Sequence, residues 1–373
     1  MEILISFIIP FIILLTIVVF IHEYGHYYFA KKYGVGVTDF SIGFGKEIFG
    51  FNDKSGTRWK FCAIPLGGYV KFFGDRNVFS QAEQEELLKE YNEEDRKKLF
   101  VVKPLYQRSL IVAAGPFANF LLAIVIFAFI YMFAGKDFTP AQIQEVQSES
   151  PAYVAGIKSG DVIQSINNRE VKSIMEVSTF INASSTEIID IKVLRNGNEL
   201  TLQVKPKFIE GKDSLGNQIN KKIIGIKVTP LNEEINRQRL GPATALYYAI
   251  KETWFVIEAS WDFVISMFKG TGDTSQLGGP IKIAKITGQV AKFGIVAFLS
   301  IMAYISISLG FINLFPIPML DRGHLMFYAF EKVLGRPLSQ KTQEGFFRIG
   351  LILLLSLMFF TTFNDLKDLG LFR

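Results

Sequence analysis

Residues 3–26 read ILISFIIPFIILLTIVVFIHEYGH, an apolar segment that ends in two histidines. The part before the first histidine carries no charge and is about as long as an α-helix that crosses the hydrocarbon core of a bilayer. If the helix continues, His22 and His26 lie at i and i+4 on one face, where both imidazoles can bind one Zn²⁺ and Glu23 can act as general base. A chance match to H-E-x-x-H is the alternative. Because ionisable groups at membrane depth are costly and usually functional, the segment predicts a metal site in a membrane helix.

The composition indicates membrane spans separated by an aqueous part. Of the 373 residues, 49% are hydrophobic and 36 are phenylalanine, which exceeds the usual content of a soluble domain, yet 20% are charged. The net charge is only +5, and the basic residues flank the apolar segments, which argues against nucleic-acid binding. The single cysteine, Cys62, excludes an internal disulfide framework and a cysteine-rich metal site. Any metal must therefore be bound by histidine and carboxylate.

We expect a multi-pass α-helical membrane protein of about four transmembrane helices, with a small α+β soluble domain inserted between the second and third. The expected parts, in chain order, are a helix with the zinc motif (1–30), a cytoplasmic loop (31–108), a second helix (109–134), the soluble domain (139–207), a linker with an interfacial helix (208–295), a third helix (296–316), a loop (317–348) and a fourth helix (349–364). A secretory signal peptide is the alternative for the first segment, but Glu2 replaces the basic flank and no small-residue cleavage site follows.

The distribution of Lys and Arg predicts the orientation. Basic residues are frequent between the first two spans and absent before the first. Because cytoplasmic loops carry the excess of Lys and Arg, the 31–108 loop is expected in the cytoplasm and the N-terminus outside. Four spans then place the 134–295 segment outside and the 316–348 loop inside.

Residues 58–74 read RWKFCAIPLGGYVKFFG, two β-prone apolar runs around Pro65-Leu66-Gly67-Gly68. This pattern is typical of a β-hairpin. Its apolar character next to the zinc helix suggests a hairpin that enters the membrane beside the site, where it must be buried or line a cavity. A hairpin on the membrane surface is the alternative. We expect Gly67, Gly68 and Tyr69 to contact substrate.

Residues 139–207 have the pattern of a small soluble domain. Residues 150–163 join a short helix to a tight turn and then a strand, with apolar positions around a turn at Asn167-Asn168. Residues 188–193 and 200–204 form a second hairpin that turns at 196–198. This order resembles a bacterial PDZ domain, which binds peptide termini by strand addition. A domain without a ligand is the alternative, and one such unit is visible.

A helical segment follows over 244–268. Trp254 and Trp261 lie seven residues apart on one face of this helix. That spacing fits a helix at the membrane interface, or a face packed on the soluble domain.

A catalytic zinc needs three protein ligands and one open position. Asp321 is the candidate for the third ligand, because it directly follows NLFPIPML (313–320) at the end of the third span. Pro316 and Pro318 remove backbone donors and end that helix, so the aspartate can turn inward. His324, three residues later, is the rival ligand.

Three motifs in this order resemble the site-2 protease family of M50-type intramembrane zinc metalloproteases: HEYGH (22–26), GPFAN (115–119) and NLFPIPMLDRGH (313–324). The soluble domain narrows the resemblance to the bacterial regulator-of-sigma-E branch, and the resemblance covers nearly the whole chain. It implies a zinc metalloendopeptidase that cleaves single-pass membrane proteins, such as anti-sigma factors or remnant signal peptides, in regulated intramembrane proteolysis during stress. Membrane lipid and peptide termini are the other expected partners.

Carried over by position, the resemblance implies one zinc ion on His22, His26 and Asp321, and water activation by Glu23. It also implies substrate contacts from Asn313, Pro316 and Pro318. The chain departs from the family in two ways: Arg322 stands where a glycine is usual, which concerns the local loop, and one PDZ-like unit replaces a tandem pair. A catalytically silent zinc and PDZ scaffold in the membrane is the alternative function. A transporter is disfavoured because no internal repeat is visible.

Overall fold

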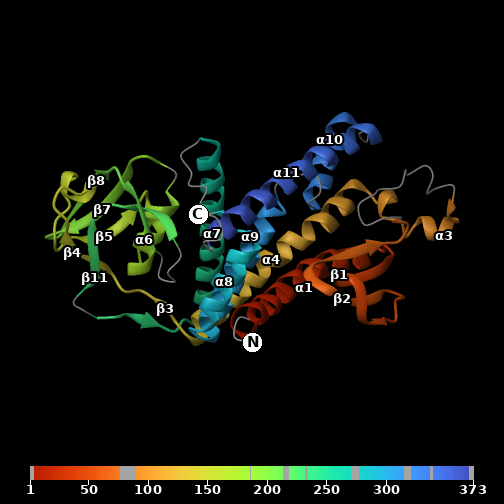
Figure 1. The fold of residues 1–373 in the computed structure, drawn as a ribbon, viewed down its shortest axis with the longest axis horizontal. Coiled ribbons are helices and arrows are strands. Elements are labelled where there is room, and N and C mark those ends of the chain that lie inside the picture. Colours follow the sequence, from red (N-terminus) through yellow and green to blue (C-terminus); the bar gives the residue numbers. More distant parts are fainter. Residues whose placement is uncertain are drawn as a thin grey trace. The chain divides into compact units, whose positions relative to one another are not determined.

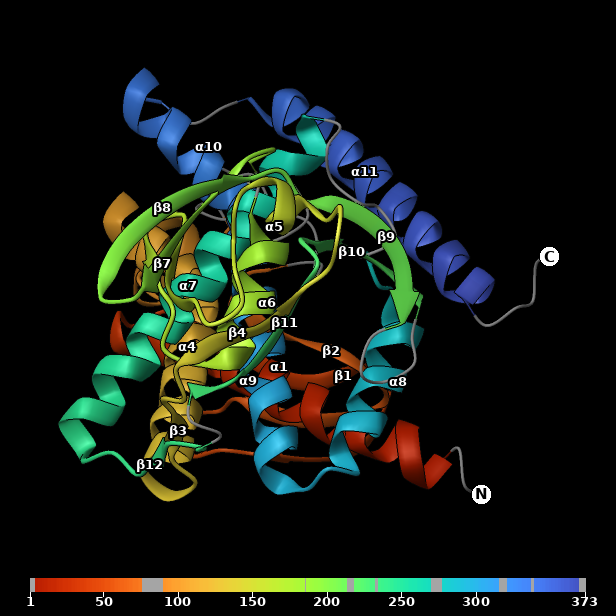
Figure 2. The same cartoon turned by 90° about the vertical axis from the view of Figure 1, so that its left-hand side faces the viewer.

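The computed structural model of the chain describes residues 4–75, 90–184, 186–212, 218–231, 234–269, 277–314, 321–336 and 339–368. The chain divides into two compact units (Figures 1 and 2). The first unit is Met1–Ile126 with Pro280–Thr362, and the second is Phe127–Gly279 with Phe363–Arg373.

Four helices of the described chain are long and apolar enough to cross a membrane, which confirms the expected number of spans. They are α1 (Ile9–Lys32), which continues a π-helical turn at Leu4–Ile8, α4 (Leu105–Phe133), α9 (Ile295–Ile312) and α11 (Gln340–Asp368). Apolar side chains surround each helix, as lipid contact requires. The chain is a multi-pass membrane protein.

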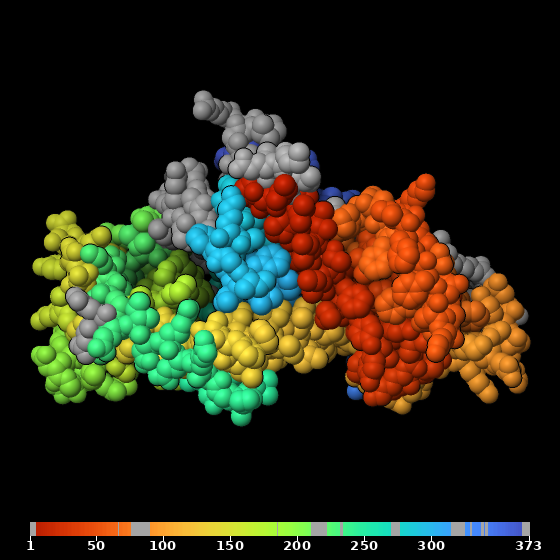
Figure 3. All heavy atoms as spheres, turned by 90° about the horizontal axis from the view of Figure 1, so that it is seen from below, coloured from red at the N-terminus to blue at the C-terminus, as the bar shows by residue number. Residues whose placement is uncertain are grey.

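Glycine permits close contacts between these helices in the first unit. A Cβ added to Gly25 of α1 would lie 2.4 Å from the Ala114 carbonyl oxygen of α4, and one added to Gly310 of α9 would lie 3.0 Å from that of Pro116. A short helix, α8 (Pro280–Ala291), contacts the N-terminal turn in the same way through Gly288 (Figure 3). Small residues at such crossings let helix backbones approach in lipid.

The loop after α1 folds into a sheet whose pairing differs from the expected hairpin. Strand β1 (Val37–Asn52) turns at 53–57 into β2 (Arg58–Phe72), so the tight turn precedes the 58–74 segment. The two apolar runs of β2 do not pair with each other. Both pair with β1, since Phe40 is a partner of Trp59 and also of Val70. Stacking of the Phe40 and Trp59 rings, with centroids 4.2 Å apart, accompanies this pairing.

Two short helical turns, α3 (Glu93–Arg96) and η2 (Phe100–Val102), lead from the sheet into α4. A further helix, α10 (Asp321–Leu334), packs on α1 and α4 through Leu325 and Tyr328. Arg108 of α4 holds α10 by an ion pair with Glu331 (2.6 Å), and its guanidinium lies 4.8 Å from the centre of the Tyr328 ring.

The second unit contains an α+β domain built on an antiparallel sheet. Its strand order is β11-β4-β5-β7-β8, and β6 pairs with β5. The strands are β3 (Lys136–Asp137), β4 (Ala141–Val146), β5 (Val162–Ile166), β6 (Arg169–Glu170), β7 (Ile189–Arg195), β8 (Asn198–Val204), β9 (Lys207–Lys212), β10 (Gln218–Ile223), β11 (Ile226–Pro230) and β12 (Arg237–Gln238). Helices α5 (Pro151–Val154) and α6 (Ile174–Ala183) accompany them. Strand β11 lies beyond the expected range 139–207, because the β9–β10 hairpin separates it in sequence from the rest of the sheet.

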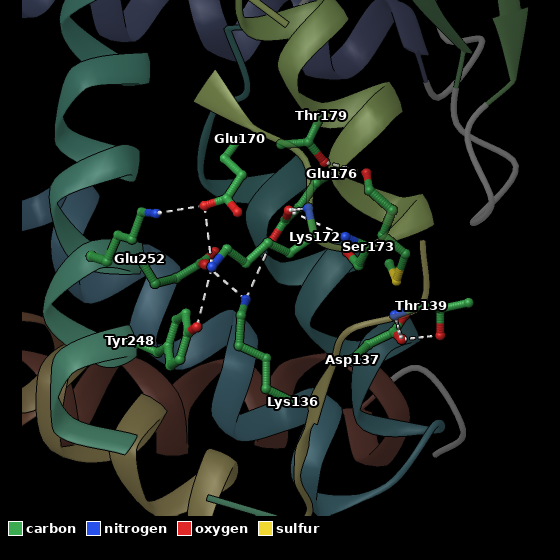
Figure 4. A network of polar contacts seen from close by, with 12 residues as sticks. Lys136, Asp137, Thr139, Glu170, Lys172, Ser173, Glu176, Thr179, Tyr248 and Glu252 are labelled. Carbon is green, nitrogen blue, oxygen red and sulfur yellow. Dashed lines mark hydrogen bonds and ion pairs between the residues drawn. The ribbon is translucent and has the colours of Figure 1, made fainter. Parts of the chain in front are cut away.

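Helix α7 (Pro242–Phe268) follows β12, and polar contacts link it to the α+β domain (Figure 4). Lys136 Nζ lies 3.3 Å from Glu176 of α6 and 3.9 Å from Glu252 of α7. Trp254 and Trp261 are 61% and 52% exposed. More than half of the surface of each residue is thus accessible, and the choice between a membrane interface and a packed face stays a prediction.

Candidate metal centre

His22 and His26 meet within the first unit as their spacing predicts. They lie one turn apart on α1, their side chains are buried, and their Nε2 atoms are 3.3 Å apart. Two nitrogens bound to one tetrahedral zinc at its usual bond length are about 3.3–3.4 Å apart. The observed separation therefore fits two ligands of a single zinc ion without rearrangement.

Helix α4 orients His26 through its backbone. Nδ1 of His26 donates to the Ile111 carbonyl oxygen at 2.8 Å. A proton on Nδ1 leaves the Nε2 lone pair available, which is the tautomer that a metal-binding histidine needs.

Gly115 lies one turn further along α4 and provides the space in which the two imidazoles converge. A Cβ at this position would stand 2.2 Å from Nε2 of His26 and 2.9 Å from Nε2 of His22. Real atoms do not approach so closely, so any side chain here would displace the imidazoles or occupy the space between them. Glycine thus preserves a cradle at the point where both nitrogens face.

Two buried asparagines flank His22. Asn119 of α4 places Nδ2 3.2 Å from Nδ1 of His22, and Asn313, the residue after α9, places Nδ2 3.4 Å from its Nε2. The main chain of Asn119 is tied to α9, because Ser306 Oγ donates to its carbonyl oxygen at 2.9 Å. The predicted substrate residue Asn313 therefore lies at the histidine pair.

Glu23 follows His22 on α1, is partly buried, and lies against β2. A Cβ on Gly68 would meet the Ser41 carbonyl oxygen at 2.6 Å and Glu23 Cγ at 3.0 Å. The next residues along β2 also face β1, since Tyr69 is the partner of Ser41 and its ring stacks on that of Phe44. The segment from Gly68 onward thus runs beside the candidate general base.

Gly67 provides the bend before this segment. Its φ of +120° suits glycine, and a Cβ there would meet the Phe44 ring at 2.6 Å. Among the predicted substrate residues, Gly67, Gly68 and Tyr69 therefore occupy one bend and edge of the sheet next to α1.

Asp53 fastens this sheet to the zinc helix. Its carboxylate accepts hydrogen bonds from Tyr27 Oη (2.8 Å) on α1 and from Trp59 Nε1 (3.1 Å), besides the donors of its own turn, Ser55 and Thr57. Burial raises the pKa of Asp53, but these hydrogen bonds outweigh burial and hold the pKa well below its usual range. The carboxylate is thus charged at neutral pH, and it binds Tyr27, the residue that follows His26 on α1.

Asp321 is the first residue of α10, and its side chain lies outside the described part of the structure. Leu325 and Tyr328 share its helical face at i+4 and i+7, and they pack on the cluster that contains Ala30 and Ile111. The side chain of His324 and all of Pro316 and Pro318 lie outside the described residues. Among the described side chains no group of three metal-ligating residues is complete.

Ile111, Gly115 and Asn119 were not predicted as site residues. They recur every four residues on α4, so they form one stripe that faces the two histidines. The signal was present as a glycine and an asparagine within an otherwise apolar span, because a polar side chain in lipid must face protein.

Comparisons with known proteins agree over almost the full length. Residues 10–357 match the sequence model of the family described as Peptidase family M50. The chain is 42% identical to a Mesorhizobium japonicum protein named as a zinc metalloprotease, with 96% of this chain and 98% of that protein aligned. A similarly named protein of Agrobacterium fabrum is 41% identical (98% and 96% aligned), and the metalloprotease MmpA of Caulobacter vibrioides is 35% identical (96% and 95% aligned).

Proposed function

The chain belongs to peptidase family M50 and is a zinc metalloendopeptidase, and from this premise we propose that it cleaves single-pass membrane proteins within or near their spans. The observation that carries the proposal is the pair of buried Nε2 atoms, 3.3 Å apart inside a membrane helix, at the glycine cradle of α4. A site on a membrane helix is accessible to the membrane segment of a substrate, which supports this class of substrate.

One zinc ion would be held by His22, His26 and Asp321. When bound, zinc polarises the scissile carbonyl and lowers the pKa of a bound water to about 7. Glu23 accepts the proton of the attacking water and returns it to the leaving amine. The carboxylate of Asp321 offsets part of the metal charge, which suits a site surrounded by lipid. We expect Asn313, whose Nδ2 lies 3.4 Å from Nε2 of His22, to donate to the substrate main chain.

The substrate would bind as an added strand along β2. A transmembrane helix satisfies its own backbone, so it must unwind locally to expose a peptide bond. Phe73 N–H donates to the Gly36 carbonyl oxygen at 2.8 Å, toward β1, while Phe72 N–H donates away from β1 to the Asp75 carboxylate. Because donors on neighbouring strand residues point to opposite sides, we expect Val70 N–H to face away from β1, where it could bond to an added strand.

The outer part of the β1–β2 sheet supports its entry into the bilayer. Several exposed side chains at the far end are large and apolar, with Ile48 74% and Phe49 60% exposed, although Lys46 beside them is exposed too. Water would disfavour such a surface, whereas lipid would accept it. Strand addition at this sheet would then take place at membrane depth, next to Glu23.

Metal content and cleavage of a model transmembrane peptide test the site together. His22→Ala and Asp321→Ala should each lose bound zinc. Glu23→Gln keeps the size of the side chain but cannot accept the water proton, so zinc should stay while cleavage falls by orders of magnitude. Retained zinc in Asp321→Ala with loss in His324→Ala would transfer the third-ligand role to His324. Near-normal cleavage by Glu23→Gln would overturn the mechanism.

We further propose that the chain acts in regulated intramembrane proteolysis as an orthologue of the bacterial regulator-of-sigma-E protease. The HEYGH, GPFAN and NLFPIPMLDRGH motifs support this, as does the α+β domain between α4 and α9. That domain would be a PDZ unit, and its edge strand β11 would receive peptide termini. Anti-sigma factors and remnant signal peptides are the proposed substrates in a stress response.

The proposed location is the bacterial inner membrane with the site near the cytoplasmic side. Lys31 and Lys32 end α1, and Lys103 and Arg108 flank the start of α4, so positive charge gathers at one end of both helices. Cysteines at Lys97 and Ser148, in a Cys62→Ser background, can be labelled in spheroplasts with an impermeant thiol reagent. Labelling only at residue 148 is expected, because it lies in the periplasmic part. Labelling only at residue 97 would reverse the orientation.

A further inference from the structure

The pairing of the β1–β2 sheet defines its outer edge. Residues 39–42 of β1 pair with the first run of β2 (58–61) and also with the second run (68–71), so they lie between the two runs. Among the described strands, none pairs with the other side of the second run. This run therefore presents the edge to which a substrate strand would be added, with Gly68 next to Glu23.

The chain forms one main-chain pair on this edge by itself. Phe72 N–H donates to the Asp75 carboxylate, and Asp75 N–H donates to the Phe72 carbonyl oxygen, each at 3.2 Å. Gly74, with a φ of +89°, forms the tight turn between them. Two reciprocal bonds between one pair of residues are the pattern of an antiparallel hairpin, except that a carboxylate here replaces one carbonyl. The turn is therefore a hairpin that ends after a single pair.

Both bonds lie on the side of Phe72 that an added strand would need. Phe73 N–H donates to the Gly36 carbonyl oxygen at 2.8 Å, which is on the β1 side. The N–H and C=O of one strand residue point to the same side, and the side alternates along the strand, so those of Phe72 point outward. Asp75 occupies both groups. Burial raises the pKa of Asp75 to about 6, although the Phe72 N–H and the Lys71 charge lower it, so little water competes for this carboxylate.

We propose that Asp75 is a specificity-determining residue that ends the substrate strand at Val70. By alternation, Gly68 and Val70 are the outward positions before Phe72, so a substrate pairs with these two and is blocked at the third. The strand from residue 68 to residue 72 spans about 13 Å. The extended part of the substrate on this side of Glu23 is thus limited to about four residues, and the rest of its span stays helical. This inference rests on the proposed addition of the substrate to β2.

A scan of backbone esters along a model transmembrane peptide tests the proposal with the full-length protein in detergent. An ester removes one N–H and weakens the adjoining carbonyl as an acceptor, while the side chain stays the same. With the unmodified enzyme, kcat/KM should fall at alternate positions on one side of the scissile bond. The sensitive position farthest from that bond should pair with Val70, so Val70→Pro should remove its effect.

Asp75→Ala frees Phe72 N–H and should add one sensitive position, two residues farther from the scissile bond. The ester there should lower kcat/KM about threefold or more, the effect of one main-chain hydrogen bond. Asp75→Asn keeps a side-chain oxygen that accepts from Phe72, so it should give the unmodified pattern. Asp95→Ala is the matched control, because the described partners of that carboxylate are Asn92 and Lys98.

Two results would overturn the inference. A sensitive position in the unmodified enzyme beyond the one that Val70→Pro removes would mean that Phe72 already pairs with the substrate. An unchanged scan in Asp75→Ala, with zinc content retained, would mean that the carboxylate only closes the turn. Cleavage without any sensitive position would instead refute the strand addition on which the inference rests, and loss of both zinc and cleavage in His22→Ala checks the proposed function separately. If Asp75→Ala does not fold, the scan of the unmodified enzyme still decides.

Discussion

Two polar networks of this chain are built on opposite principles. Around His22 and His26, in the membrane unit, the described partners are an amide side chain at each flank and a main-chain carbonyl, all buried and uncharged. Around Lys136, in the second unit, the partners are carboxylates and rings at partly exposed positions (Figure 4).

The surrounding medium explains the difference. In lipid an unpaired charge is costly, and the described partners of the two histidines are neutral groups, each of which contacts a different imidazole nitrogen. Near water an ion pair is worth little, and its members have alternatives. Lys136 faces both Glu176 and Glu252, and Lys172 contacts both Glu170 and Tyr248. Single substitutions should therefore be severe in the first network and mild in the second.

The largest effect is expected from Gly115→Ala. The added methyl group would lie 2.2 Å from Nε2 of His26, so the imidazoles cannot keep their positions. Zinc affinity should fall at least 100-fold, and cleavage should be lost with it. Gly345→Ala on α11 is the matched control, because a Cβ there meets nothing within 4 Å. If metal analysis finds stoichiometric zinc in Gly115→Ala, the space left by Gly115 is not required for zinc binding.

A proline on β2 should have the next largest effect. Val70→Pro removes the N–H that faces away from β1, so cleavage of a transmembrane substrate should fall about tenfold or more with zinc retained. Lys71→Pro instead removes a donor that points toward β1, the partner strand of residue 71, and should lower the thermal stability as well. The comparison measures kcat/KM and Tm in both variants. If Val70→Pro cleaves normally, the sheet is a membrane anchor and not a substrate strand.

Asp53→Ala tests the fastening of the sheet to α1. Loss of the carboxylate leaves Tyr27 Oη and Trp59 Nε1 without this acceptor, which should cost about 1–3 kcal/mol of stability. Zinc should be retained and KM should rise, because the sheet is displaced while the histidines stay. Asp95→Ala is the control, since its ion pair with Lys98 is on the surface and is screened by solvent, so its loss should change the stability little.

The contribution of the Asp53 carboxylate to stability should fall at low pH. The pKa of Asp53 is lower in the folded state than its unfolded value of about 3.9, so the unfolded state binds more protons near that pH. Its stabilising contribution is present above about pH 4 and is lost as the pH falls through the folded-state pKa. The difference in Tm between the unmodified protein and Asp53→Ala should therefore shrink on acidification below pH 4. A difference that stays constant would assign the loss to packing.

The smallest effects are expected in the network of Figure 4. Glu252→Gln should cost no more than about 0.5 kcal/mol, because Lys136 keeps the closer Glu176. Glu176→Gln should cost more, about 1 kcal/mol, because this carboxylate also accepts from the backbone N–H groups of Lys172 and Ser173 at the start of α6. Thermal unfolding measures both. A larger loss of stability in Glu252→Gln than in Glu176→Gln would mean that the ion pair contributes more than the helix cap.

The local sequence determined the membrane spans, the spacing of the histidines and the enzyme class. Apolar length alone predicts a span, since lipid requires each segment to satisfy its own backbone. An i, i+4 pair on a helix needs no information beyond the helix itself, and the two Nε2 atoms meet as that spacing predicts. The roles of Glu23 and Asp321 remain predictions of the same kind.

Only the tertiary structure decided which surfaces complete the site. The 58–74 segment has the composition of a hairpin. Its two apolar runs pair with β1 and not with each other, because strand pairing depends on which other strand is available. Gly115 and Asn119 carry no chemistry of their own in sequence, and they matter because α4 approaches α1 closely enough for their Cα and carboxamide to face the imidazoles. Periodicity is a property of one segment, whereas contact is a property of two. The sequence could therefore name the ligand pair but not the neighbours that orient it.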